Sequence, residues 1–283
     1  MKKTHLIILI ICCAIVYFIL LSLLFTRIRS FNFPGTKAIA VIEIEGPIYE
    51  SNTVVNQLKS YTKNPLIKGI LLRIDSPGGG VSASQEIYSE VKYAKAKGKT
   101  IVVSMGSLAA SGGYYIACPA DIIVANPGTL TGSIGVIMEF PVVDDLMKKL
   151  GIQFEVIKSK EHKDIGSPFR KMTDQERQLL NETTLDIYDQ FVQVIIDNRK
   201  ITKEKVLQFA DGRIFSGRQA QALGLVDSLG TYEDAIKITA KMCGITGEPQ
   251  IIKERPKFSL IKRILSRSLY KLFSPLPLYL YTR

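Results

Sequence analysis

Hydrophobic and polar positions follow a strand-like period and a helix-like period in turn along most of the chain. Lys37–Glu45 alternates and is rich in Val and Ile, which predicts a strand. Residues 51–63 predict a helix, and Ile67–Ile74 predicts a second, apolar strand. The expected elements after these are helix Ser82–Lys97, strand Thr100–Ser104, a helix through Tyr114–Ala117, strands Asp121–Ala125 and Ser133–Ile137, helix Asp144–Leu150, strand Phe154–Ile157, helices Thr173–Arg199, Thr202–Phe209 and Gly217–Leu223, and strand Val226–Asp227. Strands separated by helices predict βαβ units and an α/β fold.

The N-terminus carries an uncharged run of 20 residues, Leu6 to Phe25. A bilayer core of about 30 Å requires about 20 apolar residues in a helix, so the run predicts a transmembrane anchor. A buried core helix is rarely so uniformly apolar, and a cleaved signal peptide has a shorter apolar region that ends at small residues. The short basic leader before the run favours a single pass, with the bulk of the chain outside the cytoplasm.

The net charge of +11 resides at the two ends of the chain, because residues 30–250 hold equal numbers of acidic and basic side chains. A neutral middle excludes a nucleic-acid binding surface there. In the basic tail, Phe258–Phe273 has the spacing of an amphipathic helix, which would lie on an anionic membrane surface or pack on the domain. We expect a leader and anchor over residues 1–30, one folded domain over 31–250, and the tail over 251–283.

The sequence gives no sign of a metal site or a cofactor site. It has two histidines and no C-x-x-C spacing, and no P-loop lysine follows its glycine-rich loop. Cys118 and Cys243 are 125 positions apart, and we expect two buried thiols rather than a bridge.

Two small-residue segments carry candidate chemistry, each after an expected strand. In Asp75-Ser76-Pro77-Gly78-Gly79-Gly80, the glycines allow backbone amides to approach a ligand and hold an oxyanion, although a simple tight turn has the same composition. Ala109-Ala110-Ser111-Gly112-Gly113 is an A-x-S-x-G variant of the nucleophile elbow. Ser107 is a rival serine without a following glycine, and a small-residue packing segment is the alternative to a catalytic role.

A serine nucleophile requires a base, and the segment around residue 162 offers two. His162 could serve a Ser-His-Asp triad, and its neighbour Lys163 could serve a Ser-Lys pair. A lysine acts as a base only when it is neutral, so it must be desolvated and away from carboxylates. The residues alone leave both candidates open, and a solvated surface lysine is the common alternative.

Five ordered motifs resemble signal peptide peptidase A, a family of bacterial membrane-bound serine peptidases. They are D-S-P-G-G-G, A-A-S-G-G-Y-Y-I-A, N-P-G-T-L-T-G-S-I-G-V, H-K-D-I-G-S-P-F-R and D-G-R-I-F-S-G-R-Q-A, spread over roughly residues 35–240. The resemblance implies a crotonase-like (Clp protease-like) α/β core of repeated ββα units. In length, the chain is similar to the short form of the family, with one set of motifs per chain.

The resemblance also implies a Ser-Lys dyad. Matched by motif, the nucleophile is Ser111, the general base is Lys163, Ser133 orients that lysine, and the oxyanion amides belong to Gly78 and Gly112. The family works without a cofactor at the bacterial cytoplasmic membrane. It cleaves residual signal peptides, so apolar extended peptides and membrane lipid are the expected partners. Short-form members form homo-oligomeric rings in which neighbouring subunits supply the serine and the lysine. The alternative is a crotonase-like protein without peptidase activity, such as an acyl-thioester enzyme or a membrane scaffold.

Overall fold

The computed structural model describes residue 17 and residues 37–254 of the chain. The chain divides into two units, Met1–Lys37 and Ala38–Arg283, and every element described below lies in the second unit. Among the described residues, no helix has both the length and the hydrophobicity needed to cross a bilayer. The expected anchor, apart from Tyr17, and the tail beyond Glu254 lie outside the described residues.

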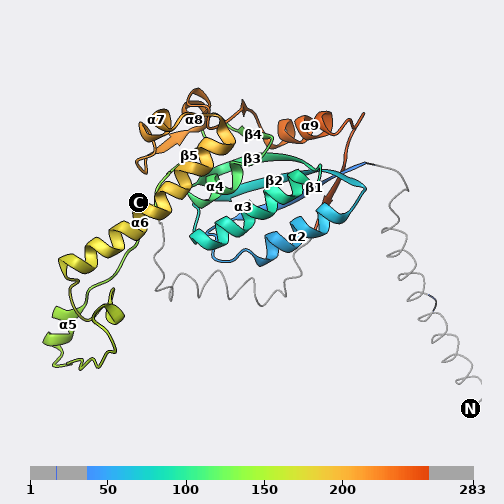
Figure 1. Cartoon of the computed structure of the whole chain (residues 1–283). Helices are drawn as coiled ribbons and strands as arrows, with labels where there is room; N and C mark the ends of the chain where they lie inside the picture. Colours follow the sequence, from blue (N-terminus) through green and yellow to red (C-terminus); the bar gives the residue numbers. More distant parts are fainter. Residues whose placement is uncertain (1–16, 18–36, 255–283) are drawn as a thin grey trace, which may run out of the picture. The chain divides into compact units, whose positions relative to one another are not determined.

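One sheet organises the described part of the second unit (Figure 1). Its order is β6-β5-β3-β2-β1-β8, with β4 paired to β3 and β7 paired to β4. The pairs are parallel except for β5 with β6, which is antiparallel. The strands are β1 (Ala38–Glu45), β2 (Ile67–Ser76), β3 (Thr100–Ala110), β4 (Ile122–Ala125), β5 (Leu130–Gly132), β6 (Ile214–Ser216), β7 (Ser228–Leu229) and β8 (Gln250–Lys253).

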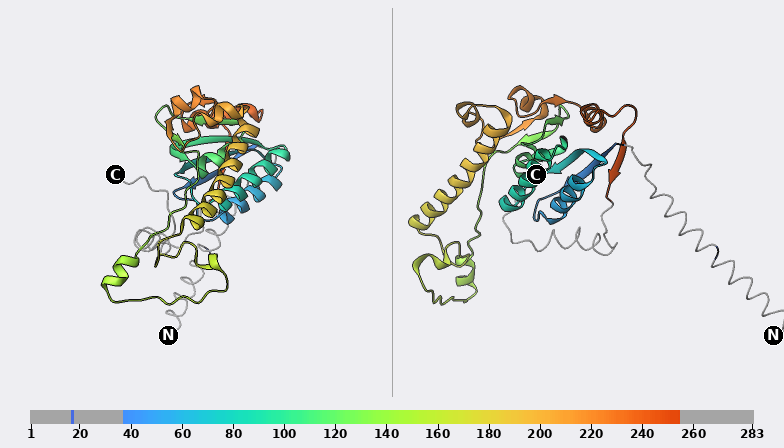
Figure 2. Two further views of the ribbon diagram at one scale, coloured as in Figure 1. Left: turned by 60° about the vertical axis from the view of Figure 1, so that its left-hand side comes forward. Right: turned by 45° about the vertical axis from the view of Figure 1, so that its right-hand side comes forward.

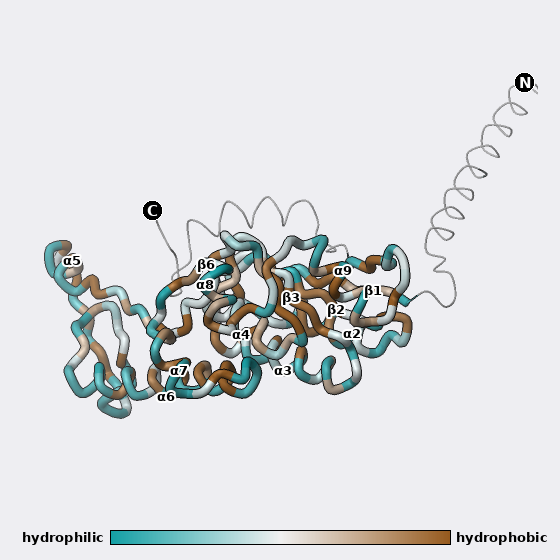
Figure 3. The backbone as a smooth tube through the Cα atoms, turned by 90° about the horizontal axis from the view of Figure 1, so that it is seen from above, coloured by the Kyte–Doolittle hydropathy of each residue, from teal (hydrophilic) through white to brown (hydrophobic). Residues whose placement is uncertain are grey.

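Helices cover both faces of this sheet (Figure 1). They are α2 (Asn52–Lys63), α3 (Val81–Ala96), α4 (Gly112–Ala117), α5 (Asp144–Lys149), the 3-10 turn η1 (Glu161–Asp164), α6 (Asp174–Arg199), α7 (Lys203–Leu207), α8 (Gly217–Ala222) and α9 (Tyr232–Met242). Along β1, Ala40 and Ile42 pack in the cluster under α2 and α3, whereas Ile39 and Val41 pack against α9. The central strands are therefore apolar on both faces, as Figure 3 shows for β2 and β3.

The sequence predicted most elements within one or two residues, and several of its errors lie near the site. Strand β3 continues six residues beyond the expected end at Ser104, because its small residues 108–110 pair with β5. No strand forms at Ser133–Ile137 or Phe154–Ile157, so those two predictions are wrong. The apolar side chains that suggested a strand at 154–157 are exposed, whereas Ile134 of the other segment is buried without forming a strand. Strands β5, β6 and β8 and helix α9 were not predicted, and β8 crosses the expected boundary at residue 250.

Residues 135–172, here called the arm, project from the sheet beside the N-terminal end of α6 (Figures 1 and 2). None of these residues is buried. The arm nevertheless has internal packing, since the rings of Phe154 and Phe169 stack with their centroids 3.7 Å apart. It carries nine exposed large apolar side chains between positions 137 and 157: Ile137, Phe140, Val142, Leu146, Leu150, Ile152, Phe154, Val156 and Ile157.

Candidate active site

Three parallel strands end at one edge of the sheet and bring three sequence motifs together. Strands β2, β3 and β5 are neighbours, and the pairs Ser76↔Ala109 and Ala110↔Gly132 align their carboxyl ends. The glycine-rich loop, Ser111 and Ser133 each follow directly after one of these ends. This edge is where open α/β sheets form their ligand-binding crevices.

Ser111 occupies a sharp turn between β3 and α4. Its φ and ψ of 51° and −120° lie in a region that side chains other than glycine rarely adopt. The turn is held from both sides, because the Ser111 N–H donates to the Gly132 carbonyl at 2.8 Å and the Tyr115 N–H donates to the Ser111 carbonyl at 2.9 Å. Strain of this kind collects at functional sites, and a strand–turn–helix serine is the geometry of a nucleophile elbow.

The glycine-rich loop lies against Ser111 through its backbone. The Ile48 N–H donates to the Gly78 carbonyl at 2.8 Å, and the Gly80 N–H donates to the Ile48 carbonyl at 2.8 Å. The Gly78 N–H donates to Ser76 Oγ at 3.1 Å. The Gly79 N–H has no acceptor among the described residues, so Gly79 is a candidate for the oxyanion site as well as Gly78.

Gly112 has little space for a side chain between Ser84 of α3 and the glycine-rich loop. A Cβ placed on Gly112 would lie 2.4 Å from Ser84 Oγ and 3.3 Å from the Gly79 nitrogen. A Cβ on Gly78 would lie 2.6 Å from the Gly112 nitrogen and 2.9 Å from the Ser111 Cβ. The absence of side chains at these positions thus keeps two backbone amides beside Ser111.

Ser133 lies next to this cluster in a second strained turn. Its φ is 49°, and the preceding Gly132, whose carbonyl binds the Ser111 amide, has a φ of 82°. The Ser133 N–H donates to the Arg213 carbonyl at 2.8 Å, which ties the turn to the end of β6. The structure therefore brings Gly78, Ser111, Gly112 and Ser133 side by side, although they come from three separate motifs.

A small pocket of about 30 Å³ opens beside Ser111. It is mainly apolar, and its lining within the described residues contains no lysine, histidine or carboxylate. The lining residues are Gly79, Val81, Ser84, Gln85, Ser111, Gly112, Tyr115, Gly135, Val136, Ile187 and Phe191. Edge-to-face contacts of Tyr115 with Tyr88 and Phe191 stiffen its wall, each with ring centroids 5.1 Å apart.

Both candidate bases lie on the arm, and neither lines the pocket around Ser111 of the same chain. Lys163 is exposed on η1 and forms no ion pair with any described residue. His162 is half-buried, and its Nδ1 atom is enclosed without a hydrogen-bond partner among the described residues. A single chain therefore presents the serine and the candidate bases in separate places.

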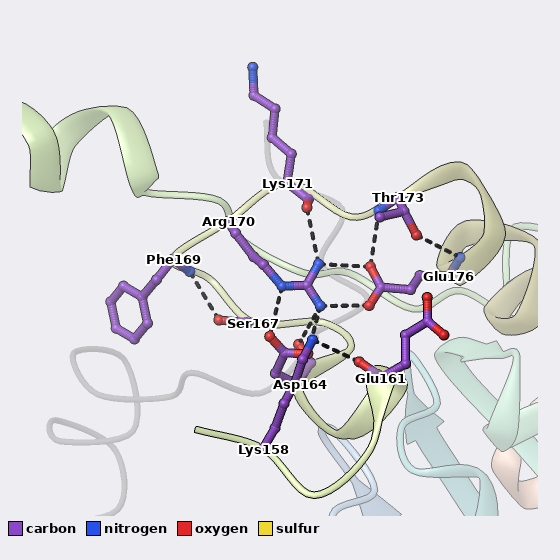
Figure 4. Close-up of polar contacts among 9 residues, drawn as sticks. All are labelled: Lys158, Glu161, Asp164, Ser167, Phe169, Arg170, Lys171, Thr173 and Glu176. Carbon is purple, nitrogen blue, oxygen red and sulfur yellow. Dashed lines mark hydrogen bonds and ion pairs between the residues drawn. The ribbon is translucent and has the colours of Figure 1, made fainter. Parts of the chain in front are cut away.

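Four charged side chains, here called the ion cluster, fasten η1 to the start of α6 (Figure 4). Asp164 accepts from Lys158 Nζ at 2.7 Å and from both Arg170 Nε and Nη2 at 2.8 Å. Arg170 also donates to Glu176, with Nη1–Oε2 at 2.8 Å and Nη2–Oε1 at 2.5 Å. The Arg170 and Lys158 bonds hold the pKa of the Asp164 carboxyl well below its usual range. The Arg170 bonds, with the Thr173 amide, lower that of Glu176 to about 2.

The remaining candidates have less suitable surroundings. Ser107 is exposed on β3, before the strained turn. Cys118 is a free thiol whose pKa burial raises to about 12, so it is not a nucleophile. Within residues 37–254, no group of His, Cys, Asp and Glu side chains is arranged to hold a metal ion.

Comparison with protein families gives two matches. Residues 93–246 match the model described as Peptidase family S49, and residues 38–127 match the model described as Clp protease. The latter match and the mixed sheet confirm a Clp protease-like α/β core. Among solved structures, a ClpP1 mutant from Listeria monocytogenes aligns with a TM-score of 0.48 and 16% identity, over 69% of this chain and 93% of that one.

Three curated relatives illustrate the similarity. A protein of Synechocystis sp., named as a candidate protease, is 46% identical over 220 residues, 77% of this chain and 79% of that protein. A candidate signal peptide peptidase, SppA, of Enterococcus faecium is 39% identical over 66% of this chain and 55% of its own length. Protease 4 of Salmonella typhi is 37% identical over 72% of this chain and 34% of its own length. The matched part of this chain thus corresponds to about half of the Enterococcus faecium protein and about a third of the Salmonella typhi protein.

Proposed function

The chain belongs to peptidase family S49, and from this we propose that it is a serine endopeptidase with Ser111 as nucleophile and Lys163 as general base. The observation that carries the proposal is the strained elbow of Ser111 beside two backbone amides. The amides of Gly79 and Gly112 would stabilise the oxyanion that forms when Ser111 Oγ attacks a peptide carbonyl. Preorganised donors of this kind provide a large share of the catalysis of acyl transfer.

The lysine would come from a neighbouring subunit. This step is supported by the separation of Lys163 from the Ser111 pocket of the same chain and by the exposed apolar side chains of the arm. Exposed apolar surface of this extent marks an interaction site, and a Clp protease-like fold is consistent with oligomeric assembly. Ser133, one residue after the carbonyl that binds the Ser111 amide, would accept a hydrogen bond from the incoming lysine and orient it.

In the reaction, neutral Lys163 would take the Ser111 proton as Oγ bonds to the carbonyl carbon, and would then give it to the leaving amine. In a second step water would attack the acyl-enzyme. Lys163 would take a proton from that water and return it to Ser111 Oγ as the acyl group leaves. Enclosure at the subunit contact would remove the lysine from water and favour its neutral form. No metal or cofactor takes part in this scheme.

The substrates would be extended apolar peptides, including signal peptides left in the membrane after their release from preproteins. Two observations support this substrate class. The lining of the Ser111 pocket is uncharged and mainly apolar. The uncharged N-terminal run fits a chain held at the cytoplasmic membrane with its catalytic domain outside the cytoplasm. Peptides with small or medium aliphatic side chains near the cut should therefore be cleaved best.

Labelling with a fluorophosphonate probe tests the proposal. The full chain should become covalently labelled at Ser111, as located by peptide mass spectrometry, while Ser111→Ala should not react and the matched Ser107→Ala should react like the parent. Absence of label from an assembled oligomer that also leaves apolar peptides intact would instead favour a crotonase-like protein without peptidase activity.

A further inference from the structure

Lys163 is followed in the sequence by a carboxylate, that of Asp164. Asp164 ionises more readily than a free aspartate, because three donors from Lys158 and Arg170 hold its carboxylate. A bare carboxylate so near would favour the protonated, inactive form of the lysine. In the structure the Asp164 oxygens face the ion cluster and not Lys163, which pairs with neither acidic neighbour. Lys163 must be neutral to act as a base, and an Asp164 carboxylate that is bonded to other cations favours its protonated form less than a bare carboxylate would.

The ion cluster is balanced in charge. Lys158 and Arg170 supply two positive charges, and Asp164 and Glu176 supply two negative charges. Arg170 joins both carboxylates, and the Glu176 side chain is only 4% exposed, which anchors the cluster to the capping box at the start of α6. The cluster as a whole is therefore neutral, and its opposite charges cancel one another in part at a neighbouring group.

We propose that Arg170 is a positioning residue for catalysis: it cancels the charge of Asp164 and fixes the η1 turn, so that Lys163 reaches the neighbouring Ser111 as a neutral amine. The inference rests on the proposed function, in which Lys163 is the base. Other charged or titratable groups near the turn are Lys160, Glu161, His162 and Lys171. On the Ser111 side, Tyr115 is the ionisable group in the pocket lining, which carries no formal charge.

The test is the pH dependence of peptide cleavage by the full-length protein. Arg170→Met leaves one uncompensated negative charge, which should move the rising limb of the pH–rate profile toward alkaline pH. If the uncompensated charge acts over a separation on the order of 8 Å, an effective dielectric constant of about 20 to 80 gives a shift of roughly 0.4 to 1.5 pH units. Lys158→Met should shift the limb in the same direction, and it leaves the Arg170–Glu176 contact and the α6 cap untouched.

Three further variants separate charge from structure. Arg170→Lys keeps the charge and loses the two-pronged geometry, so its rate should fall while its limb stays near the parent position. Adding Asp164→Asn to Arg170→Met restores neutrality and should return the limb toward the parent pH. Lys148→Met removes a cation from a surface pair with Asp144 on α5 and should leave the limb unmoved.

A loss of rate that is equal at all pH values in Arg170→Met and Lys158→Met would overturn the proposal and leave the ion cluster a purely structural role. If Arg170→Met does not fold, Lys158→Met and its combination with Asp164→Asn decide the matter. Lys163→Ala is assayed beside them: full activity in that variant refutes the proposed function itself. An inactive Lys163→Ala with unshifted limbs refutes only the role of Arg170.

Discussion

The strained backbone of Ser111 makes a prediction about stability whose sign is unusual. Replacing a residue by glycine normally destabilises a protein relative to alanine by about 0.5–1 kcal/mol, because glycine loses more backbone freedom on folding. At Ser111, φ is 51° and ψ is −120°. A side chain held in such a region costs about 1–3 kcal/mol, a cost that glycine avoids. Ser111→Gly should therefore be more stable than Ser111→Ala, by roughly 0.5–2 kcal/mol after the entropy of glycine is subtracted.

Thermal unfolding of the two variants measures this difference. For a domain of about this size, each kcal/mol corresponds to about 2–4 °C in Tm. Both variants should lack peptidase activity, since both lack the hydroxyl. The matched control is Ser107, which lies in β3 and does not have a positive φ: there Ser107→Gly should melt below Ser107→Ala. If glycine is also the less stable choice at Ser111, the turn is not strained as described, and the argument for an elbow loses its main support.

Four other outcomes are expected. Lys163→Ala should reduce peptide cleavage to near the level of Ser111→Ala in a kcat/KM assay, whereas His162→Ala should have a mild effect; the opposite order would indicate a His-based triad. Ser133→Ala should lower kcat less than Lys163→Ala, because Ser133 acts through the lysine, and an equal loss would mean a different role. Peptides with Leu or Ala near the cut should be cleaved faster than peptides with Lys or Arg, and a strict preference for basic residues would contradict the apolar pocket. Finally, the folded-state pKa of the Glu176 carboxyl, about 2, lies below its ordinary value of 4.5. Its ionisation therefore stabilises the fold above pH 4.5, and this stabilisation is lost as pH falls toward 2. Glu176→Gln should flatten the decline of Tm over this pH range, and an unchanged slope would refute the contribution of Glu176.

The sequence predicted the fold better than it predicted the site, for physical reasons that particular residues illustrate. Strands β1 and β2 and helix α3 bury apolar side chains against the core of their own domain. The spacing of their apolar residues therefore locates these elements from the sequence alone. The A-x-S-x-G segment pointed to Ser111 because a sharp turn requires small residues on both sides. The glycine-rich loop is held by Ile48, which bonds the Gly78 carbonyl and the Gly80 N–H and is a non-local partner that no local pattern reveals.

The arm could not be predicted by the same means. Its apolar residues at 154–157 have the alternation of a strand, but they remain exposed in the single chain. An apolar side chain that another subunit would cover carries the same signal as one buried in its own domain. For the same reason the spacing of Ser111 and Lys163 in the sequence gives no information on whether one chain brings them together.

Mixing two inactive variants tests the central claim most directly, namely that Ser111 and Lys163 of neighbouring subunits form one active site. Ser111→Ala and Lys163→Ala are each expected to be inactive alone. In a randomly reassembled equal mixture, a site works when one subunit retains its serine and the adjacent one retains its lysine, so about a quarter of the parental activity should return in a cyclic oligomer. Recovery near that value, measured as peptide cleavage after dissociation and reassembly, is the predicted result. A mixture that reassembles and stays as inactive as its components would contradict the account.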